Sequence, residues 1–250
     1  SKFDTAIYST ILEHANIIVH HGNASIHLIK KHFPECREAH HIVCPHGPYT
    51  YKSEDSLKAR ATYRLPISKY VFLNFGRQHH YKGFRFIQEV FAKWDDNRSL
   101  LFTIGPRITS GRRNGILGTA NLFKQEIIDP RLSALVSRFS TRSKCILRPF
   151  GKDEIPKIIS AADVFFLGHQ DGLNSGLVTL AVSYGKPIVF PDLGNFSEQL
   201  FGWPWKESYK PGKIDSAVKA LQKMTERVDQ YPPRRQCRMA PCELVGKACS

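Results

Sequence analysis

Short apolar runs alternate with amphipathic stretches along most of the chain. The runs are bounded by Gly, Pro or polar residues, as is typical of buried parallel strands. They predict strands at residues 17–20, 42–44, 71–75, 100–104, 146–147, 164–167 and 188–190. Apolar residues at helical spacing predict helices at residues 4–15, 23–32, 55–64, 84–93, 121–139, 154–162, 177–184 and 214–228. Strands that alternate with helices indicate an α/β fold built on a doubly wound parallel sheet.

The stretch from residue 162 to residue 199 contains strand, polar loop, helix and strand in succession. Gly185 ends the predicted helix as a C-cap residue would. The polar loop, residues 168–176, lies between the carboxyl end of a strand and the N-terminus of a helix. Open parallel sheets bind ligands at that edge, and the helix dipole and backbone N–H groups favour a phosphate there.

The pattern divides the chain into three parts. Residues 1–50 supply two strands and two helices, too few for a core of their own, so they are interpreted as the remnant of an N-terminal domain and an interdomain segment. Residues 51–230 carry the α/β domain, in which the basic, glycine-rich residues 109–118 are expected to form a mobile loop. Residues 231–250 have no periodicity, contain three of the six cysteines and are predicted to be an irregular tail.

Composition changes the picture mainly through charge. The formal net charge of the 250-residue chain is +14, which favours an anionic partner: nucleotide phosphates, an anionic membrane surface or nucleic acid. No apolar run approaches membrane-spanning length, and the N-terminus has no signal-peptide pattern. The six cysteines form no CxxC pair, so a reduced, cytoplasmic protein is the simplest interpretation.

A first candidate motif follows the strand at residues 71–75. Gly76 allows a tight exit, and Arg77 and Lys82 place two cations on one loop before Gly83 and a helix. Arg77 could grip a diphosphate in a fork, with Lys82 as a point charge. The alternative is a solvated basic loop. The dinucleotide-binding GxGxxG and the P-loop signature are both absent.

A second candidate motif occupies the loop that begins at His169. Asp171 could bind sugar hydroxyls, while Asn174, Ser175 and Gly176 could bind phosphate through N–H groups. The alternative is an Asx turn and an N-cap by Asn174 or Ser175. The two interpretations are compatible, because a cap and a phosphate site use the same helix end.

A metal site is not predicted. The histidines, among them His20, His21, His79 and His80, lack the i, i+4 spacing with an acid that zinc hydrolases use. The three tryptophans are interpreted as packing residues because no alternation of basic and aromatic residues surrounds them.

The two motifs in this order resemble the C-terminal half of GT-B glycosyltransferases, most closely the retaining nucleotide-sugar transferases of family 4. The resemblance runs from about residue 15 to residue 221. It implies a Rossmann-like GT-B C-terminal domain in which Arg77 and Lys82 hold the donor diphosphate. Asp171 would match the first Glu of the family's Glu-x7-Glu motif and act as the catalytic acid that faces the donor sugar. Further contacts to the diphosphate are expected from Asn174, Ser175 and Gly176, and contacts to the donor sugar or nucleotide from Gly76, His169, Gly172 and Thr179.

The chain also departs from the family pattern. The second Glu, which usually binds ribose hydroxyls, has no counterpart: Leu180 takes its place, and Thr179 or residues 174–175 are the candidate substitutes. The first acid is an Asp, one methylene shorter. Residues 45–47 resemble the interdomain segment of the family, and most of the acceptor-binding domain is missing, so the chain alone is expected to transfer little or no sugar.

The function implied by this resemblance is the donor-binding portion of a glycosyltransferase in bacterial capsule or other surface polysaccharide synthesis. Its substrates would be a nucleotide sugar, such as a UDP- or GDP-sugar, and a glycan or lipid-linked acceptor, with no cofactor and no metal. A cytoplasmic enzyme, peripheral at the inner, anionic face of the membrane, is expected, without nucleic acid as a partner. The alternatives are another GT-B enzyme, such as a nucleotide-sugar epimerase, and a non-enzymatic basic module that binds nucleic acid or a membrane.

Overall fold

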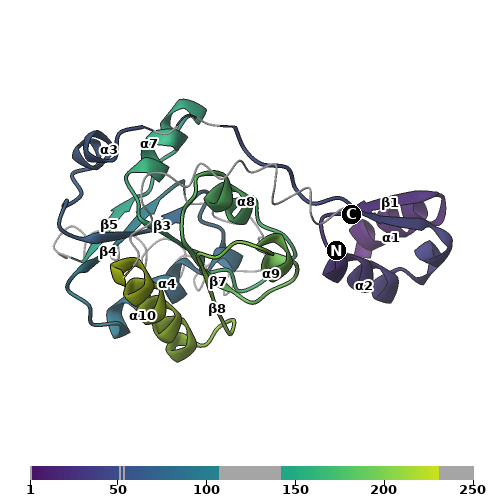
Figure 1. Cartoon of the computed structure of the whole chain (residues 1–250). Helices are drawn as coiled ribbons and strands as arrows, with labels where there is room; N and C mark the ends of the chain where they lie inside the picture. The colour runs from purple at the N-terminus through teal and green to yellow at the C-terminus, as the bar shows by residue number, and fades with distance from the viewer. Residues whose placement is uncertain (1, 51, 53, 107–141, 231–250) are drawn as a thin grey trace, which may run out of the picture.

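The computed structural model describes residues 2–50, 52, 54–106 and 142–230. These residues form a large unit built on a six-stranded sheet and a smaller unit built on a two-stranded sheet, joined by an extended segment (Figure 1). The loop predicted at residues 109–118, the helix predicted at 121–139 and the tail from residue 231 lie outside the described residues. None of the described helices is long and apolar enough to cross a bilayer.

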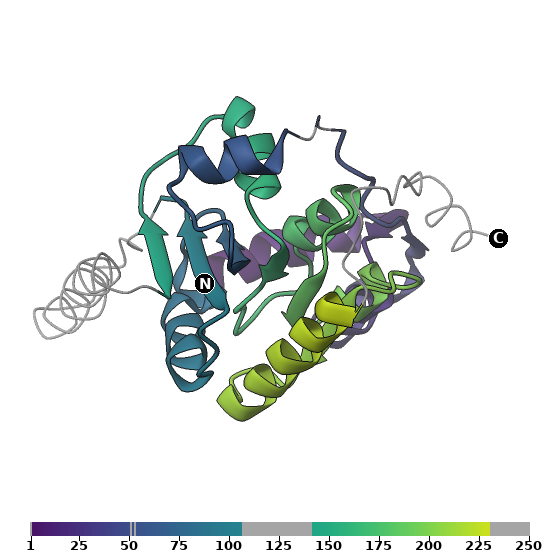
Figure 2. The same ribbon diagram turned by 60° about the vertical axis from the view of Figure 1, so that its left-hand side comes forward.

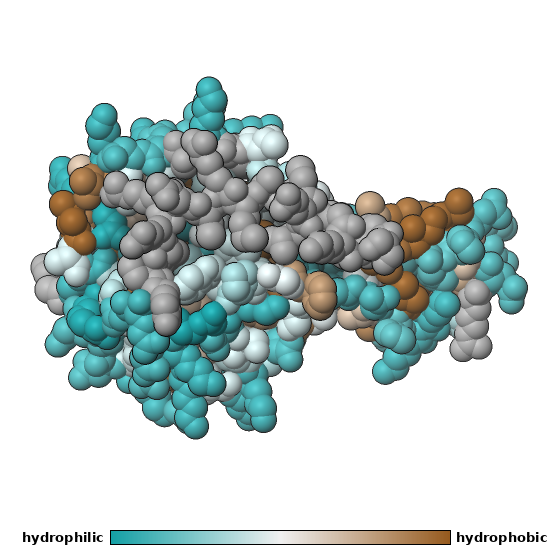
Figure 3. Space-filling model, viewed as in Figure 1, coloured by the Kyte–Doolittle hydropathy of each residue, from teal (hydrophilic) through white to brown (hydrophobic). Residues whose placement is uncertain are grey.

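The smaller unit contains two parallel strands and three helical segments: α1 (Lys2–Glu13), β1 (Ile17–His20), α2 (Asn23–His32), the 3-10 helix η1 (Pro34–Glu38) and β2 (His40–Val43). One face of its sheet is apolar and open to solvent. Val19 and Ile42 pair across the two strands and are 60% and 42% exposed. Figure 3 shows apolar residues gathered on the surface of this unit.

The larger unit has six parallel strands: β3 (Tyr70–Phe75), β4 (Ser99–Ile104), β5 (Ser143–Ile146), β6 (Val164–Phe166), β7 (Ile188–Pro191) and β8 (Lys206–Tyr209). Their order across the sheet is β5-β4-β3-β6-β7-β8. The chain therefore builds outward from β3 in one direction, then returns and builds outward from β6 in the other. The point where the direction reverses lies between β3 and β6, which is where open α/β sheets bind ligands.

Helices cover both faces of this sheet, as a doubly wound fold requires. One face carries α3 (Ser56–Thr62), α7 (Ile155–Ser160), α8 (Gly176–Ser183) and α9 (Phe196–Gln199). The other carries α4 (Phe84–Lys93) and α10 (Ile214–Gln230). Figure 2 shows α3 and α7 above the sheet and α4 and α10 below it. The predicted α/β class and the doubly wound parallel sheet are confirmed.

Alternation along the buried strands supplies both cores. Val71 and Leu73 of β3 face the core under α3 and α8, whereas Phe72 between them faces the core under α4 and α10. Phe165 and Phe166 divide in the same way on β6. Each of these side chains is almost completely buried, and replacing one such Phe by Ala costs about 3–5 kcal/mol of stability.

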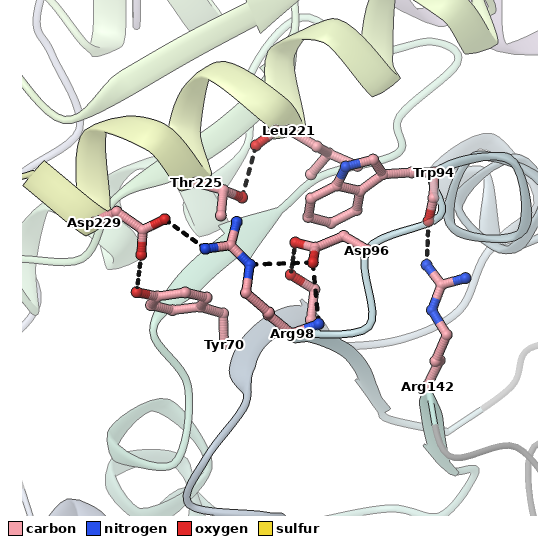
Figure 4. A network of polar contacts seen from close by, with 9 residues as sticks. Tyr70, Trp94, Asp96, Arg98, Arg142, Leu221, Thr225 and Asp229 are labelled. Atoms are coloured by element: carbon pink, nitrogen blue, oxygen red, sulfur yellow. Dashed lines mark hydrogen bonds and ion pairs between the residues drawn. The ribbon is translucent and has the colours of Figure 1, made fainter.

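A polar network fixes α10 against the edge of the sheet at which β3 and β4 begin (Figure 4). Asp229 of α10 accepts hydrogen bonds from the Tyr70 hydroxyl and, at 2.8 Å, from Arg98. The hydrogen bond to Asp229, followed by burial, raises the pKa of Tyr70 to about 12. Arg142 donates to the carbonyl of Trp94 nearby. Loops lie at the opposite edge of the sheet, where the strands end.

Three features of these elements differ from what the sequence pattern suggests. The sequence pattern does not predict β8, because only Tyr209 of its four residues is buried and no apolar run marks it. Asn is a common N-cap residue, but Asn23 is the first residue of α2, and the N-cap position is Gly22, with no side-chain hydrogen bond of its own. The strand predicted at residues 146–147 corresponds to β5, which begins three residues earlier, at Ser143, and ends at Ile146.

Candidate functional site

A cavity of about 320 Å³ opens where β3 and β6 end side by side. Two loops enclose it, one from each strand, together with the N-terminus of α8 and one residue of the segment that joins the two units. The lining residues are Tyr49, Phe75, Tyr81, Lys82, Ile155, His169, Asn174, Ser175, Gly176, Leu177 and Leu180. The cavity therefore lies at the point where the strand order reverses.

The loop after β3 leaves the sheet through a glycine. Gly76 has a φ of +99°, which favours glycine, and its N–H donates to the carbonyl of Ile104 at 3.0 Å. Gln78 folds back and donates from Nε2 to the Gly76 carbonyl at 2.8 Å. A Cβ on Gly105 would lie 1.9 Å from the same carbonyl, so the neighbouring loop needs glycine as well. These contacts fix the path that leads to Lys82 at the end of the 3-10 helix η2 (His80–Lys82).

The two loops are held together at close range. Gly83 has a φ of +63°, and a Cβ there would lie 2.0 Å from the carbonyl oxygen of Gly168. The N–H of Gln170 donates to the carbonyl of Tyr81 at 2.7 Å. Because the backbones touch at these points, Lys82 of one loop and His169 of the other share the same cavity.

His169 and Lys82 place an imidazole and an amine in the cavity. His169 is 3% exposed, lies between the rings of Tyr81 and Phe196, and has no partner for Nδ1 among the described residues. Burial, and then the charge of Lys82, lower the pKa of His169 to about 4. Burial and the charge of Arg77 lower the pKa of Lys82. No carboxylate lines the cavity within the described part of the chain, so an anion entering it would find a positive charge without a competing partner.

The N-terminus of α8 completes the site. Ser175 occupies the N-cap position, and its Oγ accepts a hydrogen bond from the Leu177 N–H at 3.3 Å. Ser175, Gly176 and Leu177 all line the cavity. Unpaired N–H groups and the positive end of the helix dipole at such a terminus favour anions. The structure thus places the predicted cap and the predicted phosphate-binding atoms at the same helix end.

The structure distributes the predicted site residues over two positions. Five line the cavity: Lys82, His169, Asn174, Ser175 and Gly176. The other five, Gly76, Arg77, Asp171, Gly172 and Thr179, are not among the described residues that line it. Arg77 is exposed at the rim, close enough to Lys82 for its charge to lower the pKa of that amine. Asp171 is exposed, and its Oδ1 accepts a hydrogen bond from the Gly172 N–H at 2.7 Å.

Sequence reasoning did not single out the aromatic and apolar part of the wall. Phe75 ends the strand before the first motif and Tyr81 lies within the motif, so their closeness to it could have identified them as site residues. Tyr49 could not be identified in this way, because it lies far from both motifs in the sequence. Only the folded chain brings it to α8, where its N–H donates to the Ser183 Oγ at 2.9 Å. Leu180 lines the cavity, so the wall is apolar at the position where the family pattern has its second Glu.

Histidine, cysteine and carboxylate side chains do not gather into a metal-binding set within the described residues. No group of three or more such side chains with metal-binding geometry is found there. The polar side chains that line the cavity are Lys82, His169, Asn174, Ser175, Tyr49 and Tyr81.

The sequence of the chain matches no protein-family model and no curated protein. Its structure is similar to sucrose-phosphate synthase from Thermosynechococcus elongatus, with 15% identity and a TM-score of 0.71, over 99% of this chain and 55% of that one. It is also similar to a glycosyltransferase from Rickettsia africae, with 13% identity and a TM-score of 0.68, over 99% of this chain and 62% of that one. HepE from Anabaena, solved in complex with UDP and glucose, has 17% identity and a TM-score of 0.68, over 92% of this chain and 59% of that one.

These proteins are GT-B glycosyltransferases. The chain has a GT-B glycosyltransferase-like fold. The predicted resemblance is therefore confirmed at the level of the fold, for a chain that spans 55–62% of the length of these three GT-B proteins. Within the GT-B-like fold, the cavity described above lies at the carboxyl edge of the six-stranded sheet.

Proposed function

We propose that the chain is the nucleotide-sugar-binding portion of a glycosyltransferase. The observation that carries the proposal is the cavity at the point where the strand order reverses. In it, Lys82 and His169, whose Nδ1 has no hydrogen-bond partner among the described residues, lie beside the N-terminus of α8. The GT-B-like fold supports it, and so does the UDP-glucose complex of the similar protein HepE.

The diphosphate of the donor is the part of the ligand that fits this cavity best. Its oxygens accept hydrogen bonds and carry negative charge, while the cavity offers an ammonium group, helix N–H groups and no lining carboxylate within the described residues. Arg77 at the rim extends the positive surface. The sugar then lies toward the loop that carries Asp171 and Gly172 and toward Thr179 in the first turn of α8, with the nucleoside toward the apolar wall.

The reaction proposed is transfer of the sugar from a UDP- or GDP-sugar to a hydroxyl of a glycan or lipid-linked acceptor. The bond from the anomeric carbon to the diphosphate breaks, a bond to the acceptor oxygen forms, and the acceptor proton is released. Lys82 and the α8 N–H groups stabilise the charge that develops on the leaving diphosphate. By the resemblance to family 4 the configuration is retained, with Asp171 facing the sugar.

The biological setting belongs to the same proposal. A net charge of +14 suits an enzyme that works at an anionic membrane surface on a lipid-linked acceptor. Surface polysaccharide or capsule synthesis on the cytoplasmic side is the setting that this combination favours, and no cofactor or metal is part of the proposal.

Calorimetric titration with UDP, GDP and their sugar conjugates tests the ligand class. We expect Lys82→Ala to weaken nucleoside diphosphate binding by about 1.5–3 kcal/mol, the range for a hydrogen bond to a charged group. Lys223→Ala is the matched control, because Lys223 is an exposed lysine on α10, on the other face of the sheet. Equal affinity in the wild type and in the Lys82 variant, with the fold intact, contradicts the site. Binding of DNA or RNA with a steep salt dependence, and none of nucleotide sugars, would favour the nucleic-acid alternative.

A further inference from the structure

The N-terminus of α2 in the smaller unit is capped by side chains from the larger unit. The Oδ1 of Asn195 accepts a hydrogen bond from the Ala24 N–H, and Glu198 accepts one from the Asn23 N–H, both at 2.8 Å. Gly22, in the N-cap position, supplies no side-chain cap, and a Cβ there would lie 2.4 Å from the Cγ of Asn195. The two units therefore meet at the N-terminus of α2, where side chains of the larger unit accept the hydrogen bonds of the first N–H groups.

Asn195 also reaches the candidate site. Its Nδ2 donates to the Ser25 Oγ at 2.7 Å and to the Oδ1 of Asn174 at 2.9 Å, and Asn174 lines the cavity. Asn195 itself is fully buried. The oxygen and the nitrogen of the Asn195 amide thus both contact α2 of the smaller unit, and the nitrogen also contacts the wall of the cavity.

The direction of this hydrogen-bond chain is fixed at its start. The Ala24 N–H is a backbone donor, so the Asn195 atom that faces it must be the acceptor oxygen. The Asn195 amide nitrogen is then turned toward Asn174, and the Asn174 atom that receives it must again be an oxygen. This leaves the NH₂ group of Asn174 as the end that has no partner among the described residues.

We infer that Asn195 is a positioning residue for the candidate site: it orients the Asn174 amide so that two N–H donors serve the ligand, and it does so while α2 is seated against it. The inference rests on the proposed function, and it adds the reason why the wall presents donors to the acceptor oxygens of a nucleoside diphosphate. With the opposite amide orientation, a carbonyl oxygen would face those oxygens and weaken binding.

A double-mutant cycle tests this role. The substitution Asn195→Asp keeps the shape of the side chain and its acceptor for the Ala24 N–H, but removes the donor to Asn174. With whichever of UDP and GDP binds the wild type more tightly, we expect Asn195→Asp to weaken binding at least tenfold. In an Asn174→Ala background, the same substitution should change the affinity less than twofold, because the side chain through which Asn195 acts is gone.

The cycle also separates orientation from charge. If the loss came from repulsion between the new carboxylate and the anionic ligand, it would appear whether or not Asn174 is present, so a tenfold loss in both backgrounds overturns the inference. Ser25→Ala is the matched control: it removes the other acceptor of the same NH₂ group, and the affinity should stay within twofold of the wild type. A Ser25→Ala loss as large as that of Asn195→Asp also overturns it.

A spectroscopic measurement covers the case in which the Asn195→Asp substitution destabilises the fold. In wild-type protein labelled with ¹⁵N at asparagine, the side-chain NH₂ signals of Asn174, assigned by their loss in Asn174→Ala, should shift when UDP or GDP is added. Unchanged signals at saturation overturn the inference and leave the proposed function standing. If UDP, GDP and inorganic pyrophosphate all fail to bind the wild type, both are overturned.

Discussion

At the scale of single residues, burial decides the charge that the candidate site carries. His169 is enclosed by aromatic rings and faces the ammonium group of Lys82, so its imidazole stays neutral where an ordinary histidine begins to titrate. A neutral imidazole can donate or accept one hydrogen bond at each nitrogen, according to its tautomer. The site therefore combines an amine whose pKa is lowered by burial, Lys82, with one adaptable polar group, His169.

This has a consequence for stability against pH. The unfolded chain binds a proton on residue 169 with an ordinary histidine pKa of 6.5, whereas the folded chain does so only near pH 4. Between these values the unfolded state holds more protons, so the free energy of unfolding rises with pH and falls as the solution is acidified. At about pH 5 the loss that His169 causes is on the order of 1–2 kcal/mol relative to neutral pH.

Thermal or urea unfolding of the wild type and of His169→Phe across this window measures the effect. The variant keeps a ring between Tyr81 and Phe196 but cannot titrate, so we expect its stability to fall less than that of the wild type on acidification. All other titratable groups are the same in the two proteins, so their contribution cancels in the comparison. Parallel pH profiles of the two proteins would contradict the neutral, buried imidazole.

The sequence predicted the residues of the site that are adjacent along the chain. Lys82 lies between β3 and α4, and Ser175 and Gly176 lie where the connection after β6 enters α8. The ends of neighbouring strands meet, so the place of these residues at one sheet edge could be inferred. Tyr49 and Asn195 could not be found in this way. Tyr49 contacts Ser183, 134 residues later in the chain, and Asn195 contacts Asn174, 21 residues earlier and in another loop. The placement of Asp171, Thr179 and Arg77 relative to a bound donor stays a prediction.

At the scale of elements, the site depends on two loops that approach each other at glycines. Gly83 is the C-cap residue of η2 and the N-cap residue of α4, has left-handed backbone geometry, and lies against the backbone of Gly168. The approach is possible because neither residue has a side chain. The β3–α4 loop and the β6–α8 loop therefore act as one wall.

We expect Gly83→Ala to lower the free energy of unfolding by about 2 kcal/mol or more, since left-handed geometry costs about 1–2 kcal/mol and the new Cβ meets a carbonyl oxygen. Gly151→Ala is the matched control, because its φ is −80° and nothing lies within 4 Å of a Cβ there. Denaturant unfolding gives both values. Similar, small losses in the two variants would mean that the loops do not hold each other as the structure shows.

Periodicity predicted most elements because their apolar faces are continuous. α4 and α2 have the bounds that the pattern gives, and Gly185, with a φ of +63°, follows the end of α8 as the C-cap pattern requires. The exceptions are an edge strand with one buried residue, β8, and the four-residue helix α9, both too short or too polar for a periodic signal. The register of β3 against β6 could not be predicted, since it depends on packing across the whole sheet.

At the scale of the whole molecule, the two units differ in how much of their apolar surface they bury. The six-stranded unit is covered on both faces, whereas the two-stranded unit leaves Ile17, Val19 and Ile42 open to solvent. A surface of this kind on a folded chain usually contacts further protein. The chain also spans 55–62% of the length of three proteins that it resembles.

We therefore expect the 250-residue chain to bind a nucleotide sugar in the micromolar-to-millimolar range and to transfer little or no sugar. Positioning of an acceptor contributes several kcal/mol to such reactions, and the two-stranded unit offers little surface for it. Incubation with a radiolabelled UDP- or GDP-sugar and candidate acceptors, followed by separation of products, measures the transfer. Robust turnover with any acceptor would show that this chain suffices for catalysis.

The cap that the larger unit supplies to α2 also sets an order of events during synthesis. Asn23 and Glu198, which form one of these contacts, are 175 residues apart. At a synthesis rate of about 5–20 residues per second, the caps become available roughly 10–35 s after α2 has been made. Until then the N–H groups of Asn23 and Ala24 lack these two partners and depend on water.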